Sequence, residues 1–354
     1  MTGKERALAV LAGDCSGPPP LYAVVTSDTL IERLSGRRLA RHNALDTLCA
    51  VYRGHIDAVR VFTESIEPYW DEGVHTDGYG FARRTERWTT WIERRPFENT
   101  DEMADFIRDE IERFRAWKPG EEEANWLQDC DVLQSCLDPD VLFMGRVQLG
   151  SAPGSYFRDG LDNFAYLLQD YPDLVAEWAE ARHRRSLRFI PHMARPDRCP
   201  IEFLDADIGY KTGLLVSPNF LRETGWFRRI AELASAYHAA GIKLILHSDG
   251  DLRSILPDLV QTGIDGLNPI ETSAGMTLKQ VREFAPSLLL VGGIPNQVLI
   301  RGTPAEVRAC MRALKREMGG TPWWAGTSTE EFDESMKPEN IEVIMEETAH
   351  TITS

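Results

Sequence analysis

The stretch that decides the fold is KLILHSDGDLRSILPDLVQTGIDGLN, residues 243–268. An apolar run ends in His247, a helical segment follows over Leu252–Thr262, and a second short run ends in Asn268. Gly263 directly after the helical segment is typical of a helix end. A strand, a helix and a second strand in this order indicate a parallel sheet covered by helices.

The same alternation extends outward over the whole chain. Ser217-Pro218 and Thr303-Pro304 each place a capping residue before a proline, which is typical of a helix start. We therefore predict an α/β fold, a single (β/α)8 TIM barrel that forms one domain over residues 1–354. The predicted strands are Leu21–Val25, Ala58–Phe62, Val141–Val147, Ile201–Asp205, Lys243–His247, Gly266–Asn268, Leu288–Gly292 and Trp323–Ala325. The predicted helical segments include Phe164–Phe189, Pro218–Ala240, Leu252–Thr262, Leu278–Phe284 and Pro304–Glu317.

Two local patterns refine this prediction. The segment Trp70–Pro96 contains three glycines and then alternates in RWTTWIERR, which predicts a β-hairpin inserted after strand two as a rim element. Trp323 and Trp324 are adjacent in strand eight, so one is expected to face the barrel interior and the other the helices.

Composition limits the partners. The formal net charge is -16, so phosphate backbones and anionic lipid surfaces would be repelled, and we expect neither nucleic acid nor membrane as a partner. The six cysteines contain no CxxC pair and fit reduced thiols in a cytoplasmic protein. The first residues resemble an amphipathic helix more than a signal peptide, because Glu5 and Arg6 precede the apolar run and Asp14 ends it.

Barrel enzymes work at the C-terminal ends of their strands, where the loops converge. Polar residues that follow apolar strands are therefore the candidates for chemistry. Gly292 and Gly293 after strand seven would let a ligand approach the backbone. The polar candidates are Asp205, Asp207, Tyr210 and Lys211 after strand four, His247, Asp249 and Asp251 after strand five, Asn268 and Glu271 after strand six, and Thr327 after strand eight.

We predict catalytic roles for Asp207, His247, Asp249 and Glu271. Carboxylates held together have pKa values that are pushed apart, which suits proton transfer. His247, Asp249 and Glu271 could instead hold a divalent cation and leave a position open for substrate. Structural roles stay open as well: Asp207 could bind loop amides, Asp249 suits a turn, and Asp251 could cap the next helix.

The substrate is expected to be a small, partly aromatic molecule. This expectation rests on the mixture of ring, amide and charged side chains near the ends of several strands. The predicted substrate-binding residues are Tyr22, Tyr79, Arg146, Gln148, Tyr210, Lys211, Asn268 and Thr327.

Four motifs in order resemble the uroporphyrinogen decarboxylase superfamily, which also contains corrinoid-dependent methyltransferases. They are DADIGYKTGLLVSPNFLRE, KLILHSDGDLRSILPDLVQTGIDGLNPIE, LLLVGGIPNQVLIRGTPAEV and KPENIEVIMEE. Earlier in the chain, KERALAVLAG resembles the opening helix of the family and GLDNFAYLLQDYPDLV its central helix. The resemblance implies a barrel fold and, as is common in the superfamily, a homodimer.

The resemblance also separates two branches. The decarboxylases carry arginines after the first strand for the carboxylates of the tetrapyrrole, and an aspartate for its pyrrole NH groups. Here YAVVTSDTLIERL has no arginine before Arg33. The methyltransferases carry a His-x-Cys pair after strand five and a cysteine after strand eight, which hold zinc. Here His247 is retained, Asp249 replaces the first thiolate, and the second position lies near Thr327.

Three hypotheses follow from these residues and the resemblance. In the first, the protein moves a methyl group between a small substrate and a corrinoid protein, which supplies the corrinoid, with zinc as a Lewis acid on an oxygen of the substrate. In the second, it is a metal-free decarboxylase or lyase for a small acid or a tetrapyrrole, with Asp207 or Asp249 handling the proton. In the third, it is a catalytically inactive barrel used for binding.

Overall fold

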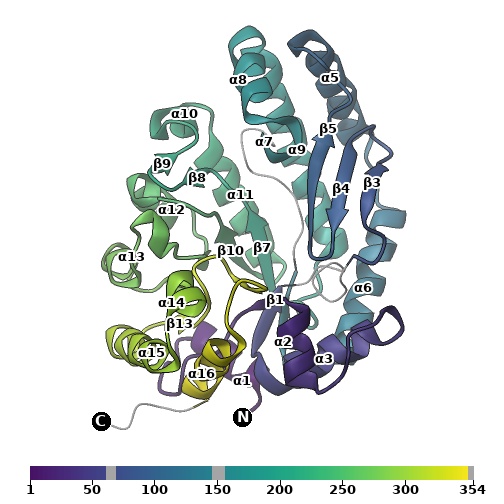
Figure 1. Ribbon diagram of the computed structural model, residues 1–354. Helices are drawn as coiled ribbons and strands as arrows, with labels where there is room; N and C mark the ends of the chain where they lie inside the picture. Colours follow the sequence, from purple (N-terminus) through teal and green to yellow (C-terminus); the bar gives the residue numbers. More distant parts are fainter. Residues whose placement is uncertain (61–68, 146–155, 350–354) are drawn as a thin grey trace.

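The computed structural model describes residues 1–60, 69–145 and 156–349, and it shows a mixed α/β fold with parallel sheets (Figure 1). The middle strands β7, β10 and β11 have the bounds that the sequence predicts. Predicted strands two and three extend into residues 61–68 and 146–155, which lie outside the described ranges. The parallel strands are β1 (Val24–Thr26), β2 (Ala58–Arg60), β6 (Leu142–Met144), β7 (Ile201–Asp205), β10 (Lys243–His247), β11 (Gly266–Asn268), β12 (Leu289–Val291), β13 (Trp323–Trp324) and β14 (Glu331–Asp333).

The parallel strands form three sheets that are linked by single bridges. One sheet has the order β13-β12-β11-β10-β7, and the other two are β2-β6 and β1-β14. Parallel bridges pair Leu21 with Ala325, Tyr22 with Ala58, and Gly145 with Glu202. These bridges connect the sheets in the strand order that the sequence predicts. Strand β14, which pairs with β1, was not predicted.

Alternate residues of the strands enter two different cores. Trp324 joins the inner cluster and Trp323 the outer cluster against the helices, as the pattern predicts. Helix α1 (Gly3–Leu11) adds Ala7 and Val10 to the inner cluster and so covers the N-terminal ends of the strands. The strand residues of the inner cluster are Tyr22, Ala58, Leu142, Met144, Ile201, Phe203, Ile245, Leu289, Val291 and Trp324.

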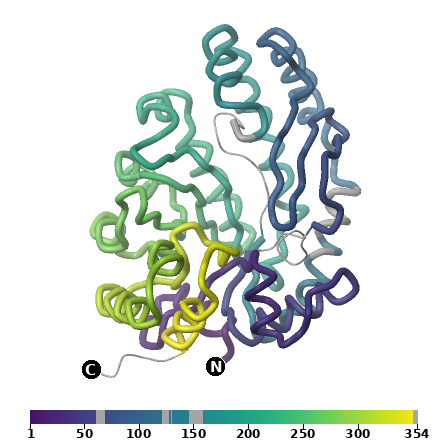
Figure 2. Tube along the Cα trace, viewed as in Figure 1, coloured from purple at the N-terminus to yellow at the C-terminus, as the bar shows by residue number. Residues whose placement is uncertain are grey.

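The helices surround the parallel strands, and α1 and α16 lie at one end of the molecule (Figure 2). Two predicted helical segments are each divided: Pro172 starts a new helix, and Gly225, with φ of 72°, separates two others. The remaining helices are α2 (Asp28–Ser35), α3 (Ala44–His55), α5 (Thr100–Ala116), α6 (Glu121–Leu137), α7 (Tyr156–Asp159), α8 (Leu161–Asp170), α9 (Pro172–Met193), α10 (Pro218–Glu223), α11 (Trp226–Ala239), α12 (Leu256–Gln261), α13 (Leu278–Phe284), α14 (Asn296–Arg301), α15 (Pro304–Met318) and α16 (Pro338–Thr348). Short 3₁₀ helices are Arg41–Asn43, Arg253–Ile255 and Thr272–Ala274.

An antiparallel sheet of three strands occupies the segment for which a two-stranded hairpin was predicted. Its strands are β3 (Gly73–Thr76), β4 (Ala82–Glu86) and β5 (Thr89–Arg94). The glycine-containing stretch before the alternating residues pairs as a strand of its own, which the sequence pattern did not indicate. This sheet lies beside α5 and α9 (Figure 1), and Phe81 joins a small separate core with Phe164 and Trp178. A second small hairpin pairs β8 (Gly209–Tyr210) with β9 (Gly213–Leu214).

Candidate functional site

Three neighbouring strands end in polar residues that share one level of the sheet. His247 at the end of β10 is in register with Asp205 of β7 on one side and with Asn268 of β11 on the other. Residues in register on paired parallel strands present their side chains to the same face of the sheet. The apolar runs thus fix the strands, and the strand register brings these three polar ends together.

Asp205, Asp207 and His247 form the tightest cluster of potential metal ligands. One ligand atom from each lies within 4.8 Å of the other two, and no other group of this kind occurs in the part of the chain that the structure describes. The Nε2 atom of His247 lies 3.5 Å from Oδ1 of Asp207. His247 is buried, whereas both aspartates are half-buried. The cluster therefore offers one nitrogen and two carboxylates to a cation.

The predicted metal set of His247, Asp249 and Glu271 differs from this cluster. Both carboxylate oxygens of Glu271 are engaged, since Oε2 accepts from the Gly250 N–H at 2.6 Å and Oε1 from the hydroxyl of Ser273. Glu271 therefore supports the loop after β10, and it is not a member of the Asp205–Asp207–His247 cluster. Asp205, which ends strand β7 in register with His247, belongs to the cluster but was not among the predicted metal ligands.

A buried ion pair that was not predicted lies at the same level. The guanidinium of Arg60 pairs with Glu330, whose Oε2 accepts the Tyr22 hydroxyl at 2.8 Å and lies 3.8 Å from Nδ1 of His247. Glu330 has φ of 64°, a left-handed conformation that side chains rarely adopt and that often marks functional sites. A charged residue in the apolar run of strand two was a usable signal for Arg60. Glu330 follows strand eight in a polar stretch and carried no such signal.

Aromatic rings pack beneath these charged groups. The ring of Phe203 stacks with Tyr22 at a centroid distance of 6.5 Å and packs against the His247 ring at 5.2 Å. The guanidinium of Arg60 lies over the same Phe203 ring at 5.7 Å. Because these rings belong to the inner core, they restrict rotation of the His247 imidazole.

Burial and mutual repulsion shift the acid–base properties of the cluster. Burial by itself lowers the pKa of His247, but the carboxylates of Glu330, Asp207 and Asp205 outweigh it and raise the pKa. Burial raises the pKa of Asp207, and the nearby Asp205 charge adds to this shift. Burial, together with the charges of Asp207 and neighbouring glutamates, raises the pKa of Asp249 to about 7.

Asp249 and Asp207 are linked through the loop after β10. The Asp249 N–H donates to Oδ1 of Asp207 at 3.0 Å, so Asp207 does bind a loop amide. The Oδ1 atom of Asp249 is buried and has no hydrogen-bond partner among the described residues. The loop is tightly packed, because a Cβ at Gly209 would meet the Asp249 carbonyl and one at Gly250 would meet the Tyr210 amide.

The predicted substrate-binding residues lie in three kinds of environment. Tyr22, Asn268 and Thr327 are fully buried and already hydrogen-bonded, to Glu330, His247 and Glu331 respectively. Exposed positions are occupied by Tyr79 on the β3–β4 turn, where Arg113 covers its ring, and by Tyr210 and Lys211 of the β8–β9 hairpin. Arg146 and Gln148 lie outside the described residues.

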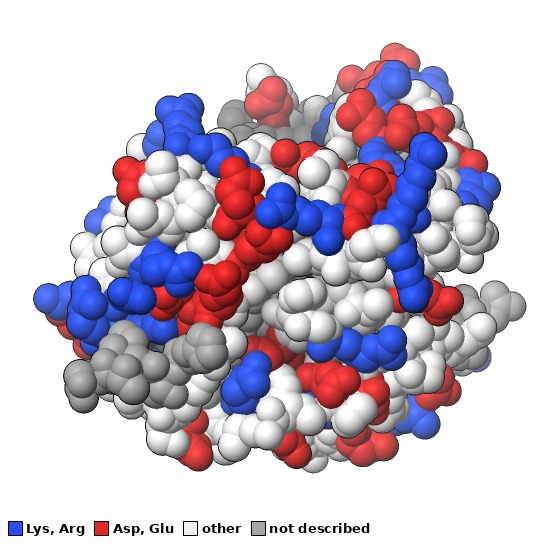
Figure 3. All heavy atoms as spheres, turned by 60° about the horizontal axis from the view of Figure 1, so that its bottom comes forward, with Lys and Arg blue, Asp and Glu red and all other residues white. Residues whose placement is uncertain are grey.

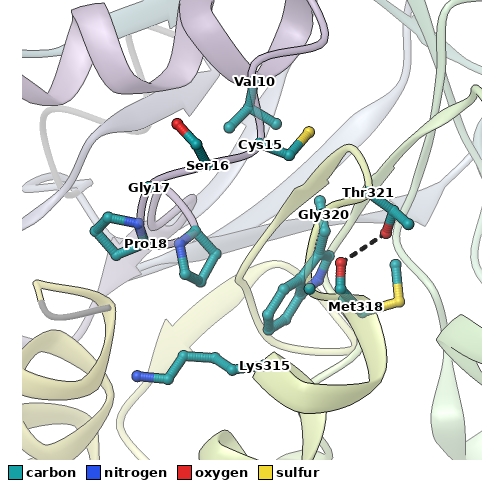
Figure 4. Close-up of a pocket in the computed structure, with 12 residues that line it drawn as sticks. Val10, Cys15, Ser16, Gly17, Pro18, Lys315, Met318, Gly320 and Thr321 are labelled. Carbon is teal, nitrogen blue, oxygen red and sulfur yellow. Dashed lines mark hydrogen bonds between the residues drawn. The ribbon is translucent and has the colours of Figure 1, made fainter. Parts of the chain in front are cut away.

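Two described cavities lie away from the cluster. One, of about 220 Å³, is formed by the loop Cys15–Pro19 and the end of α15 with the turn to Thr321 (Figure 4). The other, of about 590 Å³, is lined by parts of α1, α3 and α16. Neither is lined by a predicted site residue.

The surface carries charges of both signs. On the face shown in Figure 3, basic and acidic side chains are interspersed. No described helix is both long and apolar enough to span a bilayer.

Comparisons with known proteins agree with this architecture. A methyltransferase from Methanosarcina mazei has a similar fold, with a TM-score of 0.67 over 98% of each chain at 16% sequence identity. A candidate vitamin-B12-independent methionine synthase from Listeria monocytogenes aligns over 93% of this chain and 95% of its own at 13% identity. Its TM-score is 0.46. No curated protein sequence matches the chain.

The family comparison concerns the C-terminal part of the chain. The model of the family "Uroporphyrinogen decarboxylase (URO-D)" matches residues 212–351. This segment contains the last strands of the parallel arrangement, including β10, which ends in His247, and the loop that carries Glu330. The motif-based resemblance is thereby confirmed: the chain is similar to the uroporphyrinogen decarboxylase superfamily, with a matching family domain in residues 212–351.

Proposed function

We propose that this protein is an enzyme of the methyltransferase type, which moves a methyl group between a small substrate and a corrinoid protein. The observation that carries this proposal is the Asp205–Asp207–His247 cluster at the C-terminal ends of the strands, which is where barrel enzymes work. The family match and the fold shared with a methyltransferase support it. The proposal includes a closed (β/α)8 barrel, which the single bridges between the parallel sheets support.

The donor set of the cluster fits a zinc ion. Zinc accepts imidazole nitrogen and carboxylate oxygen, and catalytic sites use three protein ligands and one open position. The thiolates that the superfamily's zinc sites use are replaced here, and Cys199 lies before β7, at the end opposite to Asp205. A ligand set of Asp205, Asp207 and His247 is therefore harder than a thiolate site and suits an oxygen-containing substrate.

The charges of the cluster also suit a dication. Asp205 and Asp207 bring two carboxylates close to the imidazole of His247, and the charge of Asp205 raises the pKa of Asp207, a repulsion that a dication would relieve. A zinc ion in this position would supply Lewis acidity to an oxygen of the substrate. His247 and the two aspartates would hold it, the Phe203 ring would keep the imidazole in place, and the methyl acceptor would be the corrinoid of a partner protein.

A second candidate function is a metal-free decarboxylase or lyase. The observation that favours it is Asp249, whose Oδ1 is buried without a partner among the described residues and whose pKa is raised to about 7. A carboxyl group with such a pKa can give and take a proton near neutral pH. In this case Asp249 would protonate the carbon from which carbon dioxide leaves.

Zinc binding is the first test. Purified protein is depleted of metal and titrated with Zn²⁺ in competition with a chromophoric chelator. We expect one ion per chain, and we expect Asp205→Asn, Asp207→Asn and His247→Ala each to weaken binding strongly. Asp251→Asn is the matched control, because this aspartate follows the same strand but pairs with Arg253. Equal binding by all four variants would contradict the proposed ligand set.

Methyl transfer is the second test. The zinc-loaded protein is incubated with methylated donors and cob(I)alamin, and formation of methylcobalamin is followed by absorbance. Transfer that is lost in His247→Ala supports the proposal. Carbon dioxide release that persists with a chelator and is lost in Asp249→Asn supports the lyase. If neither reaction occurs with a broad panel of substrates, the inactive binding barrel is favoured.

A further inference from the structure

The contact between His247 and Asn268 joins two strand ends at a buried level. His247 Nδ1 lies 2.8 Å from Oδ1 of Asn268, and the two residues are in register on β10 and β11. An amide oxygen accepts hydrogen bonds and cannot donate them. In this arrangement the Nδ1–H of the imidazole therefore donates to Asn268.

The other ring nitrogen faces the carboxylates. With the proton on Nδ1, the neutral imidazole has its lone pair on Nε2, and Nε2 is the atom that lies 3.5 Å from Oδ1 of Asp207. The opposite tautomer would present an N–H to the cluster and could not coordinate a cation there. The identity of the group at Nδ1 therefore decides whether His247 can be a ligand.

A carboxylate is available for the same role but does not take it. Oε2 of Glu330 is 3.8 Å from Nδ1, beyond hydrogen-bond range, and it accepts the Tyr22 hydroxyl instead, while Arg60 pairs with the same carboxylate. A charged acceptor at Nδ1 would favour protonation of the whole ring. The neutral amide of Asn268 fixes the proton on Nδ1 without adding a charge.

The side chain of Asn268 makes a single hydrogen bond in the described structure. Its side chain is completely buried, yet Nδ2 has no hydrogen-bond partner among the described residues. Buried amides in proteins normally use both of their polar atoms. Its one side-chain hydrogen bond in the described structure is the contact to His247, which points to that contact as its role.

We propose that Asn268 is a positioning residue that holds the proton of His247 on Nδ1, so that Nε2 is offered to a divalent cation between Asp205 and Asp207. This inference rests on the metal site of the proposed function. It deepens that proposal by assigning the nitrogen that binds and the residue that selects it.

Two substitutions separate the hydrogen bond from the shape of the side chain. Asn268→Leu keeps a similar volume and removes the acceptor, whereas Asn268→Asp keeps an acceptor oxygen at the same position. Asn340→Leu is the matched control. Asn340 is also fully buried, but its Nδ2 donates to backbone carbonyls such as that of Leu299, so its loss affects packing without touching the cluster.

The first measurement uses the metal-free protein. Histidine labelled with ¹⁵N reports the tautomer of each neutral ring at the high-pH plateau of its titration, and His247→Gln identifies the signal. We expect the Nδ1–H tautomer in the wild type, in Asn268→Asp and in Asn340→Leu, and a gain of the Nε2–H tautomer in Asn268→Leu. An Nε2–H tautomer in the wild type, or no change in Asn268→Leu, overturns the proposal.

The second measurement is the Zn²⁺ dissociation constant from chelator competition. Loss of an outer hydrogen bond to a ligand histidine weakens metal binding roughly 10- to 100-fold, and we expect this in Asn268→Leu. Asn340→Leu should stay close to the wild type, and Asn268→Asp, which keeps an acceptor at Nδ1, should lose less affinity than Asn268→Leu. Unchanged affinity in Asn268→Leu overturns the proposed consequence for the metal. If the wild type binds no zinc, the proposed metal site fails, while the tautomer measurement still decides the role of Asn268.

Discussion

The Arg60–Glu330 pair gives the sharpest test of the electrostatics at the strand ends. The side chains are 9% and 4% exposed, so removing one partner leaves the other charge in a poorly solvated place. The pKa of Arg60 is raised because, although burial lowers it, the charges of Glu330, Tyr22, Glu331 and Asp205 outweigh burial. Glu330→Gln keeps the shape of the side chain and removes its charge.

We expect Glu330→Gln to lower the free energy of unfolding by about 3 kcal/mol, the lower end for breaking a buried pair, because other carboxylates near Arg60 remain. The unfolding entropy of a 354-residue protein is about 0.7 kcal/mol/K, so the melting temperature should fall by about 4 °C. Differential scanning calorimetry of the metal-free protein measures this shift. Arg60→Met/Glu330→Leu should be less destabilised than the sum of its single variants, because no charge is left unpaired.

Backbone strain at Glu330 provides an internal control. Its φ of 64° favours glycine, so Glu330→Gly should be more stable than Glu330→Ala by roughly 1 kcal/mol, although both lack the carboxylate. A loss below about 0.5 kcal/mol in Glu330→Gln, a range typical of surface positions, together with additive double-mutant values, would refute the reasoning that the pair is buried and coupled.

Four further outcomes are expected. Arg158→Met should lower the unfolding free energy by about 3 kcal/mol in urea titrations, since Glu110 stays buried without its main partner; Arg184→Met, at an exposed pair, should change it by less than about 1 kcal/mol. Burial lowers the pKa of His183 below its unfolded value of about 6.5. The free energy of unfolding is therefore unaffected by this group above that pH and decreases as pH falls below it, because the unfolded state then binds the proton more readily. His183→Gln should flatten the pH dependence of the melting temperature between about pH 5 and 7. Gly250→Ala should weaken zinc binding in chelator competition, because its φ of 90° and the nearby Tyr210 amide leave no room for a Cβ; unchanged affinity would contradict the loop geometry. Zinc at about 100 times its dissociation constant should raise stability by about 2.7 kcal/mol, a gain that a chelator reverses in calorimetry.

The sequence by itself determined the secondary structure around the site. Apolar runs that end in a polar residue predicted the bounds of β7, β10 and β11, because a buried parallel strand must be apolar until it leaves the sheet. Capping residues before Pro218 and Pro304 predicted two helix starts. These signals are local, so neighbouring residues suffice to determine them.

Only the tertiary structure decided which side chains meet. Asp205 reaches His247 because register across a strand pair sets the level of each side chain, whereas Glu271, which the sequence made an equal candidate, is held by a loop amide and a hydroxyl. Glu330 comes from a segment about 270 residues after Arg60, and the pairing of β14 with β1 places it there. Such contacts depend on strand register and loop packing between distant segments, and no local pattern of residue types encodes either.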